Sequence, residues 1–171
     1  QNQEGLLRLA IDALDGVDAR VLVTAGPAMA GKAFACADNV VVVDQAPHSL
    51  VFEEASAFVS HCGHGSLMRA LAKGVPVVAL PMGRDQDANA TRIVHHGLGL
   101  KPRKTRSGIR RAVERVLREP SFRRAAAVMG EHIRADAARG RLRDELLALA
   151  SASPIAAPPE RGTTLTTQPG T

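Results

Sequence analysis

The most informative stretch of this chain is Ala57-Phe58-Val59-Ser60-His61-Cys62-Gly63-His64-Gly65-Ser66. Its first four residues form an apolar, strand-like run, and a helix-like run follows at 67–73, before Gly74. A strand followed by two glycines and a hydroxyl residue at the start of a helix can hold phosphate, because glycines let backbone N–H groups approach an anion closely. Ser66 suits the N-cap of this helix, and His61 could add a hydrogen bond.

The next segment, 75–80, is a continuous apolar run with a proline near its start. This pattern is typical of a strand buried on both faces of a parallel sheet. Residues 57–81 are therefore predicted to form a strand–helix–strand unit whose two strands end at the same edge. We expect the loop at His61 and the loop at Asp85 and Gln86 to meet there, in the crevice where open α/β sheets bind ligands.

This region resembles the donor-binding signature of the nucleotide-sugar-dependent glycosyltransferases, in the branch of UDP-glycosyltransferases and bacterial antibiotic glycosyltransferases. Members of this branch have two Rossmann-like domains, the GT-B fold. The matching blocks, in order, are 43–48, 61–66, 70–71, 74–76, Pro81, 85–86 and 89–90. The signature covers residues 43–92, and a looser hydrophobic similarity extends from about residue 5 to 150. The resemblance implies a donor-binding domain at 1–150.

The resemblance also assigns donor contacts to individual residues. The implied contacts with the donor diphosphate are His61, Gly63, Gly65 and Ser66. The implied contacts with the transferred sugar are Asp85 and Gln86.

The residues that lie beside the nucleotide base are, by the same resemblance, Gln45, Ala46 and His48. Two positions depart from the family pattern. Gln45 stands where many members have an aromatic residue that stacks on the base. Arg69 stands where some members have a Glu that holds the ribose hydroxyls, and an Arg cannot accept those hydrogen bonds.

The implied activity is hexosyl transfer from a UDP or TDP sugar to a small-molecule acceptor hydroxyl, with inversion and without a metal or other cofactor. The acceptor pocket and the catalytic base belong to an N-terminal domain in this family. At 171 residues the chain is about one domain long. We therefore expect no catalytic residue in it and no turnover by it alone.

Other functions are compatible with parts of the sequence. A degenerate, non-catalytic nucleotide-sugar-binding or partner module would explain Gln45 and Arg69, and a sugar-nucleotide epimerase fragment would share the crevice. His61, Cys62 and His64 include residue types that bind zinc, although no second pair accompanies them. Cys62 as a nucleophile and Asp85 as a general base are further alternatives.

The pattern along the chain predicts an α/β fold, a Rossmann-like doubly wound parallel sheet. Strands are predicted at 20–24, 40–43, 57–60 and 75–80, with an edge strand at 98–101. Helices are predicted at 3–15, 50–54, 85–96, 105–118, 120–137 and 139–150. The remainder, 151–171, is poor in apolar residues and is predicted to be a disordered tail.

The composition of the chain indicates the cellular compartment in which it acts. No apolar run reaches the roughly 18 residues of a membrane span, and the first residues do not resemble a signal peptide. Two cysteines are too few for a disulfide framework. From these three features together we expect a cytoplasmic protein that does not bind membranes. Arginine outnumbers lysine by 18 to 4, which favours a GC-rich bacterial source.

The positive charge is concentrated at 101–143, which holds 14 Lys and Arg against 4 Asp and Glu. A nucleic-acid groove would use such a patch. However, the chain has no Trp or Tyr and only four Phe, so it lacks the stacking platforms of single-strand binders. We therefore expect a solvated helical face or a contact with another domain.

Overall fold

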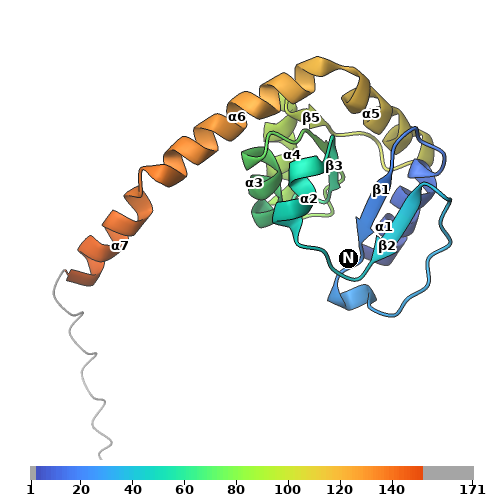
Figure 1. The fold of residues 1–171 in the computed structure, drawn as a ribbon, viewed down its shortest axis with the longest axis horizontal. Helices are drawn as coiled ribbons and strands as arrows, with labels where there is room; N and C mark the ends of the chain where they lie inside the picture. Colours follow the sequence, from blue (N-terminus) through green and yellow to red (C-terminus); the bar gives the residue numbers. More distant parts are fainter. Residues whose placement is uncertain (1–2, 152–171) are drawn as a thin grey trace, which may run out of the picture. The chain divides into compact units, whose positions relative to one another are not determined.

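The structure, a computed structural model, describes residues 3–151 (Figure 1). They belong to two compact units, the first ending at Ala138 and the second beginning at Arg139. The described part of the second unit contains helix α7 (Arg141–Ser151), at the position where the last helix was predicted. Apart from Ser151, the predicted tail lies outside the described residues.

The first unit alternates strands with helices, as the sequence pattern predicted. Its elements, in chain order, are α1 (Gln3–Leu14), β1 (Val21–Thr24), the short 3-10 helix η1 (Pro27–Met29), β2 (Val40–Val43), α2 (His48–Glu54), β3 (Phe58–Ser60), α3 (His64–Ala72), β4 (Val77–Ala79), α4 (Gln86–His95), β5 (Gly99–Leu100), α5 (Arg106–Arg118) and α6 (Pro120–Ala138). Helices α2 and α3 begin earlier than predicted, at His48 and His64.

All the strands of this unit pair in parallel, but they form two sheets rather than one. Strand β1 pairs with β2, with Val21 opposite Val40. The second sheet has the order β3-β4-β5, with Phe58 opposite Val77. Strand β5 lies at its edge, as expected. The predicted α/β class is confirmed, and the division of the sheet is a difference from the single predicted sheet.

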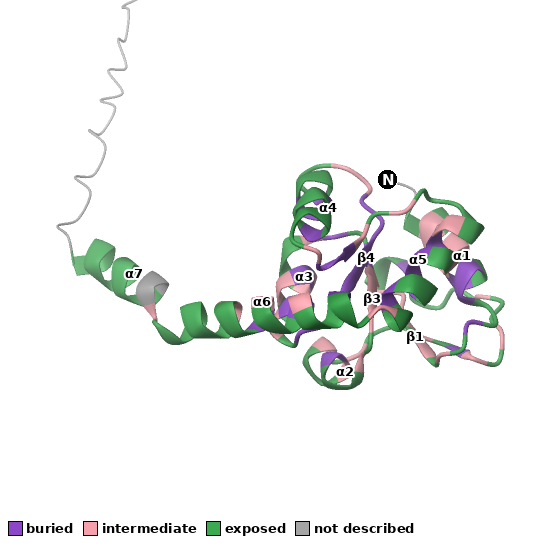
Figure 2. Cartoon of the chain, turned by 90° about the horizontal axis from the view of Figure 1, so that it is seen from above, coloured by how far each residue is buried: buried purple, intermediate pink, exposed green. Residues whose placement is uncertain are grey.

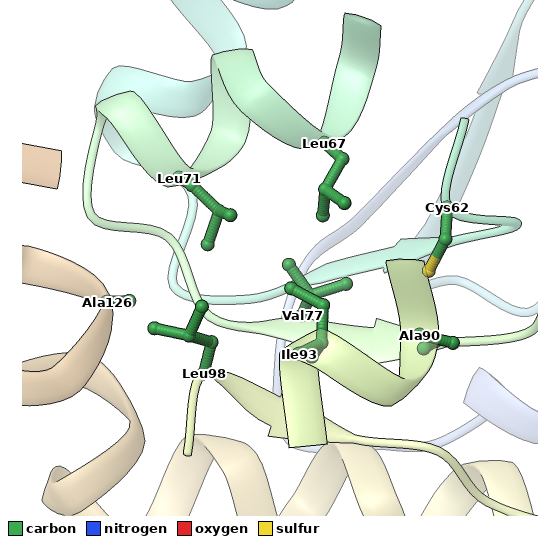
Figure 3. Packing of buried hydrophobic residues seen from close by; sticks show 9 residues of the cluster. Cys62, Leu67, Leu71, Val77, Ala90, Ile93, Leu98 and Ala126 are labelled. Carbon is green, nitrogen blue, oxygen red and sulfur yellow. The ribbon is translucent and has the colours of Figure 1, made fainter. Parts of the chain in front are cut away.

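Strand β4 is completely buried, and helices cover both of its faces. Val77 and Ala79 pack in one cluster with residues of α3, α4 and α6 (Figure 3). Val78, which points to the opposite face, packs in a second cluster with Leu14 of α1 and Val113 of α5. Figure 2 shows the buried residues concentrated at β4 and on the helix faces beside it. Helices on both faces are what a doubly wound architecture requires.

Cys62 belongs to the first of these clusters, together with Ala90 and Leu67 (Figure 3). Its side chain is fully buried. Burial away from water disfavours the thiolate and raises the pKa of the Cys62 thiol to about 11. The other cysteine, Cys36, is exposed.

Gly99 allows β5 to approach β4 closely, and its replacement should destabilise the fold. A Cβ at Gly99 would lie 1.7 Å from the carbonyl oxygen of Val77, a backbone atom that cannot move away cheaply. We expect Gly99→Ala to lower the free energy of unfolding by about 3 kcal/mol or more, as measured by urea titration. The control is Gly65→Ala, because a Cβ there meets nothing within 4 Å. Equal losses of unfolding free energy in the two variants would contradict the close approach of Gly99 to Val77.

Cys62 should be inert toward thiol reagents in the folded chain, because the thiolate is the reactive form. With an Ellman-type reagent near neutral pH, the wild-type chain should show one fast thiol, Cys36, and one that reacts only on unfolding. The Cys36→Ser variant should lose the fast phase and regain one reactive thiol in urea. A fast reaction in folded Cys36→Ser would show that Cys62 is accessible.

Candidate functional site

The loop between β3 and α3 turns sharply at Cys62, whose φ of 69° lies in the left-handed region. Residues other than glycine rarely adopt this conformation. Here the backbone N–H of Cys62 donates to Ser60 Oγ at 3.0 Å, which holds the turn in place. The chain then enters α3 through Gly63, whose carbonyl accepts the N–H of Leu67.

Gly63, and not Ser66, is therefore the N-cap of α3. The prediction of Ser66 as the cap is wrong, because the turn at Cys62 starts the helix three residues earlier than the apolar pattern suggests. No side chain caps this terminus. The first N–H groups of a helix have no carbonyl partner within it, so those of His64, Gly65 and Ser66 are available to an anion. The helix dipole adds partial positive charge at the same point.

His61 lies beside this helix start. A Cβ added at Gly63 would come within 2.8 Å of His61 Nε2, so the glycine makes room for the imidazole. The His61 side chain is exposed and lies at the edge of the sheet where β3 ends.

The loop that follows β4 is tied to the β3–α3 loop by the buried side chain of Asn89 in α4. Asn89 Nδ2 donates to the carbonyl of Cys62 at 3.1 Å and to Asp85 Oδ2 at 3.2 Å. The two loops therefore meet at one edge of the sheet, as the sequence predicted.

The predicted sugar contacts differ from each other in their surroundings. Asp85 is exposed. Gln86 is only 9% exposed, and its Oε1 accepts the backbone N–H of Met82 at 2.8 Å. The Gln86 oxygen thus holds its own loop in place, and the amide nitrogen can donate to a ligand.

Two adjoining pockets lie near these loops. The larger has a volume of about 500 Å³ and is lined by Thr24, Gly26, Pro27, Asp44, Gln45, Ala46, Pro47, His48, Ser49 and Arg69. The second, of about 320 Å³, is lined by residues of α1, by the carboxyl ends of β1 and β3, and by His61, Ser66 and Met82. The pockets share Thr24, Gly26 and His48.

The predicted site residues divide between these pockets. The three predicted base contacts line the larger pocket, together with Arg69. His61 and Ser66, two of the predicted diphosphate contacts, line the second. The remaining four, Gly63, Gly65, Asp85 and Gln86, line neither pocket.

Thr24, Gly26 and Asp44 are lining residues that the motif analysis did not single out. Thr24 Oγ1 lies 3.4 Å from His48 Nε2, which joins the end of β1 to the start of α2. All three residues lie at or just after the carboxyl ends of strands that the sequence predicted. The rule that ligands bind at this edge of an α/β sheet would have identified them.

Three further observations on the described residues, 3–151, concern metal binding, membrane spans and the basic stretch. Within them, no three His, Cys, Asp or Glu side chains are grouped so that they could hold a metal ion. No helix in this part of the chain is long and apolar enough to cross a bilayer. Part of the basic stretch is used in internal ion pairs, since Lys101 contacts Asp87 at 2.9 Å and Arg110 contacts Glu114 at 3.1 Å.

Comparison with known proteins identifies curated relatives that match most of this chain. 4'-Demethylrebeccamycin synthase of Lentzea aerocolonigenes is 36% identical over 138 residues, which cover 78% of this chain and 32% of the relative. 3-Alpha-mycarosylerythronolide B desosaminyl transferase of Saccharopolyspora erythraea is 33% identical over 129 residues, covering 74% of this chain and 31% of the relative.

Solved structures show the same similarity. The calicheamicin glycosyltransferase CalG4 matches with a TM-score of 0.72 and 28% identity, over 90% of this chain and 40% of that one. The glycosyltransferase VinC in complex with DTDP matches with a TM-score of 0.67 and 27% identity, over 75% and 33% of the two chains.

The chain thus spans about a third of the length of these curated relatives. Residues 8–149 match the model of the family described as "Erythromycin biosynthesis protein CIII-like, C-terminal domain". The resemblance seen in the sequence is confirmed, and the chain belongs to this family of glycosyltransferase C-terminal domains.

Proposed function

We propose that this chain is the donor-binding half of a glycosyltransferase, and that it binds a nucleoside diphosphate sugar, with UDP or TDP as the nucleotide. The observation that carries the proposal is the pair of adjoining pockets beside the uncapped start of α3. One pocket holds the residues expected beside a base, and the other holds residues expected beside a diphosphate. The solved relative VinC was crystallised with such a nucleotide, DTDP.

The diphosphate would lie at the start of α3. The N–H groups of His64, Gly65 and Ser66 would donate to phosphate oxygens, and the His61 imidazole would add a further donor. Gly63 and Gly65 keep side chains away from the anion. These groups are already in place before binding, so they would also stabilise the charge that develops on the leaving diphosphate.

The nucleoside would occupy the larger pocket, beside Gln45, Ala46 and His48. Arg69 lines this pocket but carries only hydrogen-bond donors. Asp44 is the carboxylate in the same lining, and its oxygens can accept hydrogen bonds from ribose hydroxyls. Asp85 and the amide nitrogen of Gln86 would contact hydroxyls of the transferred sugar.

The complete reaction needs groups that these pockets do not supply. In the proposed reaction, an acceptor hydroxyl displaces the nucleoside diphosphate from the anomeric carbon with inversion. A second domain would bind the small-molecule acceptor and provide the base that removes its proton. The backbone donors and His61 act on the diphosphate without requiring a metal ion. The reaction would take place in the cytoplasm, in keeping with the composition of the chain.

Calorimetric titration of the chain with UDP, TDP, GDP and one UDP-sugar tests this proposal. We expect one diphosphate to bind with a micromolar Kd, about −8 kcal/mol. The His61→Ala variant should bind it about tenfold more weakly or worse, because a hydrogen bond to a charged group contributes about 1.5–3 kcal/mol. The matched control is His132→Ala, since this exposed histidine of α6 lines neither pocket.

Two results would count against the proposal. Unchanged affinity of the His61→Ala variant for the nucleoside diphosphate would show that the diphosphate does not bind beside His61 at the start of α3. A folded chain that binds none of these ligands would favour the alternative, a partner module whose Gln45 and Arg69 reflect lost nucleotide binding.

A further inference from the structure

Two residues other than glycine have a left-handed backbone in the described part of the chain, Cys62 and Arg84. They lie on the two loops that meet at the sheet edge, Cys62 after β3 and Arg84 after β4. Among the same residues, eight glycines take the other positive φ angles. A larger side chain at such an angle costs free energy that glycine would avoid. Strained positions of this kind concentrate at functional sites, so both residues are candidates for a role there.

Internal contacts explain the conformation of Cys62 but not that of Arg84. Cys62 is fully buried in the core, and its N–H donates to Ser60 Oγ. Arg84 has a φ of 60°, and its side chain is exposed. Within residues 3–151, its guanidinium makes no hydrogen bond, ion pair or ring contact. The loop after β4 therefore holds a cation in a strained conformation without an internal partner.

The loop that carries Arg84 is fixed on both sides of this residue. Before it, the N–H of Met82 donates to Gln86 Oε1 at 2.8 Å. After it, Asp85 Oδ2 accepts a hydrogen bond from Asn89 Nδ2 at 3.2 Å. The Arg84 side chain thus leaves the backbone at a fixed point next to Asp85, the residue proposed to contact the transferred sugar.

The charges around this loop are mainly positive. Asp87, in the first turn of α4, is already paired with Lys101 at 2.9 Å. The hydrogen bond from Lys101 and, to a smaller extent, the charge of Lys104 lower the pKa of Asp87, so both cations act on this carboxylate. Three cations, Arg84, Lys101 and Lys104, thus stand against two carboxylates, Asp85 and Asp87. This end of the site favours a ligand group with negative charge.

The chemistry of the guanidinium indicates which group this is. Two parallel N–H groups of an arginine match the two oxygens of a carboxylate. The diphosphate is proposed to bind at the start of α3, on the other loop. An anion beside Asp85 would therefore belong to the sugar itself. A hexuronic acid supplies it, because it has a carboxylate at C6 where a neutral hexose has a hydroxymethyl group.

We propose that Arg84 selects a donor whose transferred sugar is a hexuronic acid, and that its guanidinium pairs with the sugar carboxylate beside Asp85. The inference rests on the proposed function, since it needs the donor to lie across the two loops. Arg84 acts in donor binding and specificity and takes no part in the bond exchange at the anomeric carbon.

Calorimetric titration of the chain with UDP, UDP-glucose and UDP-glucuronic acid tests the proposal. The two sugars differ only at C6, and the TDP forms replace all three probes if TDP is the nucleotide that binds. The Arg84→Gln variant removes the charge. Arg84→Gly removes the whole side chain and suits a φ of 60°, so it leaves the loop without strain. The matched control is Arg124→Gln, which removes the charge of an exposed arginine of α6.

We expect the wild-type chain to bind UDP-glucuronic acid about fivefold more tightly than UDP-glucose, or better, because the ion pair adds two charge-assisted hydrogen bonds. Both Arg84 variants should lose this preference and keep their affinity for UDP. The Arg124→Gln variant should keep the preference and the UDP affinity.

Three results would overturn this specificity. The first is equal affinity of the wild-type chain for the two sugar nucleotides. The second is a preference that survives in Arg84→Gln. The third is a loss of UDP affinity in Arg84→Gln, because the guanidinium would then contact the diphosphate. A wild-type chain that binds neither UDP nor TDP would refute the proposed donor site itself, and the sugar preference with it.

Discussion

The burial of β4 on both faces is the constraint on which the rest of the first unit depends. Its alternate residues require one layer of helices at Val77 and Ala79 and another at Val78. Because β3 pairs with β4 in parallel, the loops that follow the two strands must emerge at the same edge. Asn89 then joins these loops through its contacts with Cys62 and Asp85. The site is thus a consequence of strand pairing supported by one buried amide.

The order and type of the elements could be predicted from the sequence because their apolar patterns are strong. The run at 75–80 has no polar residue, which is typical of a strand covered on both faces. The edge strand at β5 was also predictable, because a glycine, Gly97, stands just before it and can end the preceding helix. In the structure, Gly97 follows α4 with a φ of 65°. These features depend on local chemistry that each segment carries by itself.

The details that the sequence missed depend on contacts between segments or on unusual backbone conformations. Ser66 looked like the N-cap of α3, but the left-handed turn at Cys62 gives this role to Gly63. Gln86 was predicted as a sugar contact, and its oxygen also accepts the N–H of Met82, four residues earlier in the same loop. Hydrogen bonds of this kind depend on the loop conformation and leave no signal in the apolar pattern.

The candidate site was predictable in its outline and less so in its lining. His61 and Ser66 were identified from the strand–glycine–helix pattern, and Gln45 and His48 from the resemblance. The residues Thr24, Gly26 and Asp44 lie at or just after the ends of the strands of the first sheet, and of the three only Asp44 falls within a block of the family signature. They complete the larger pocket together with residues 45–49 and Arg69.

An amide NMR titration of the chain with TDP tests most directly whether the nucleotide binds at the start of α3. We expect the amides of His64, Gly65 and Ser66 to shift together with those of residues 45–48, with a single binding curve. Amides of α5, on the opposite face of β4, should not move. Shifts confined to the basic stretch at 101–111, with the start of α3 unchanged, would show instead that the anion binds to surface charge and not to the site at α3.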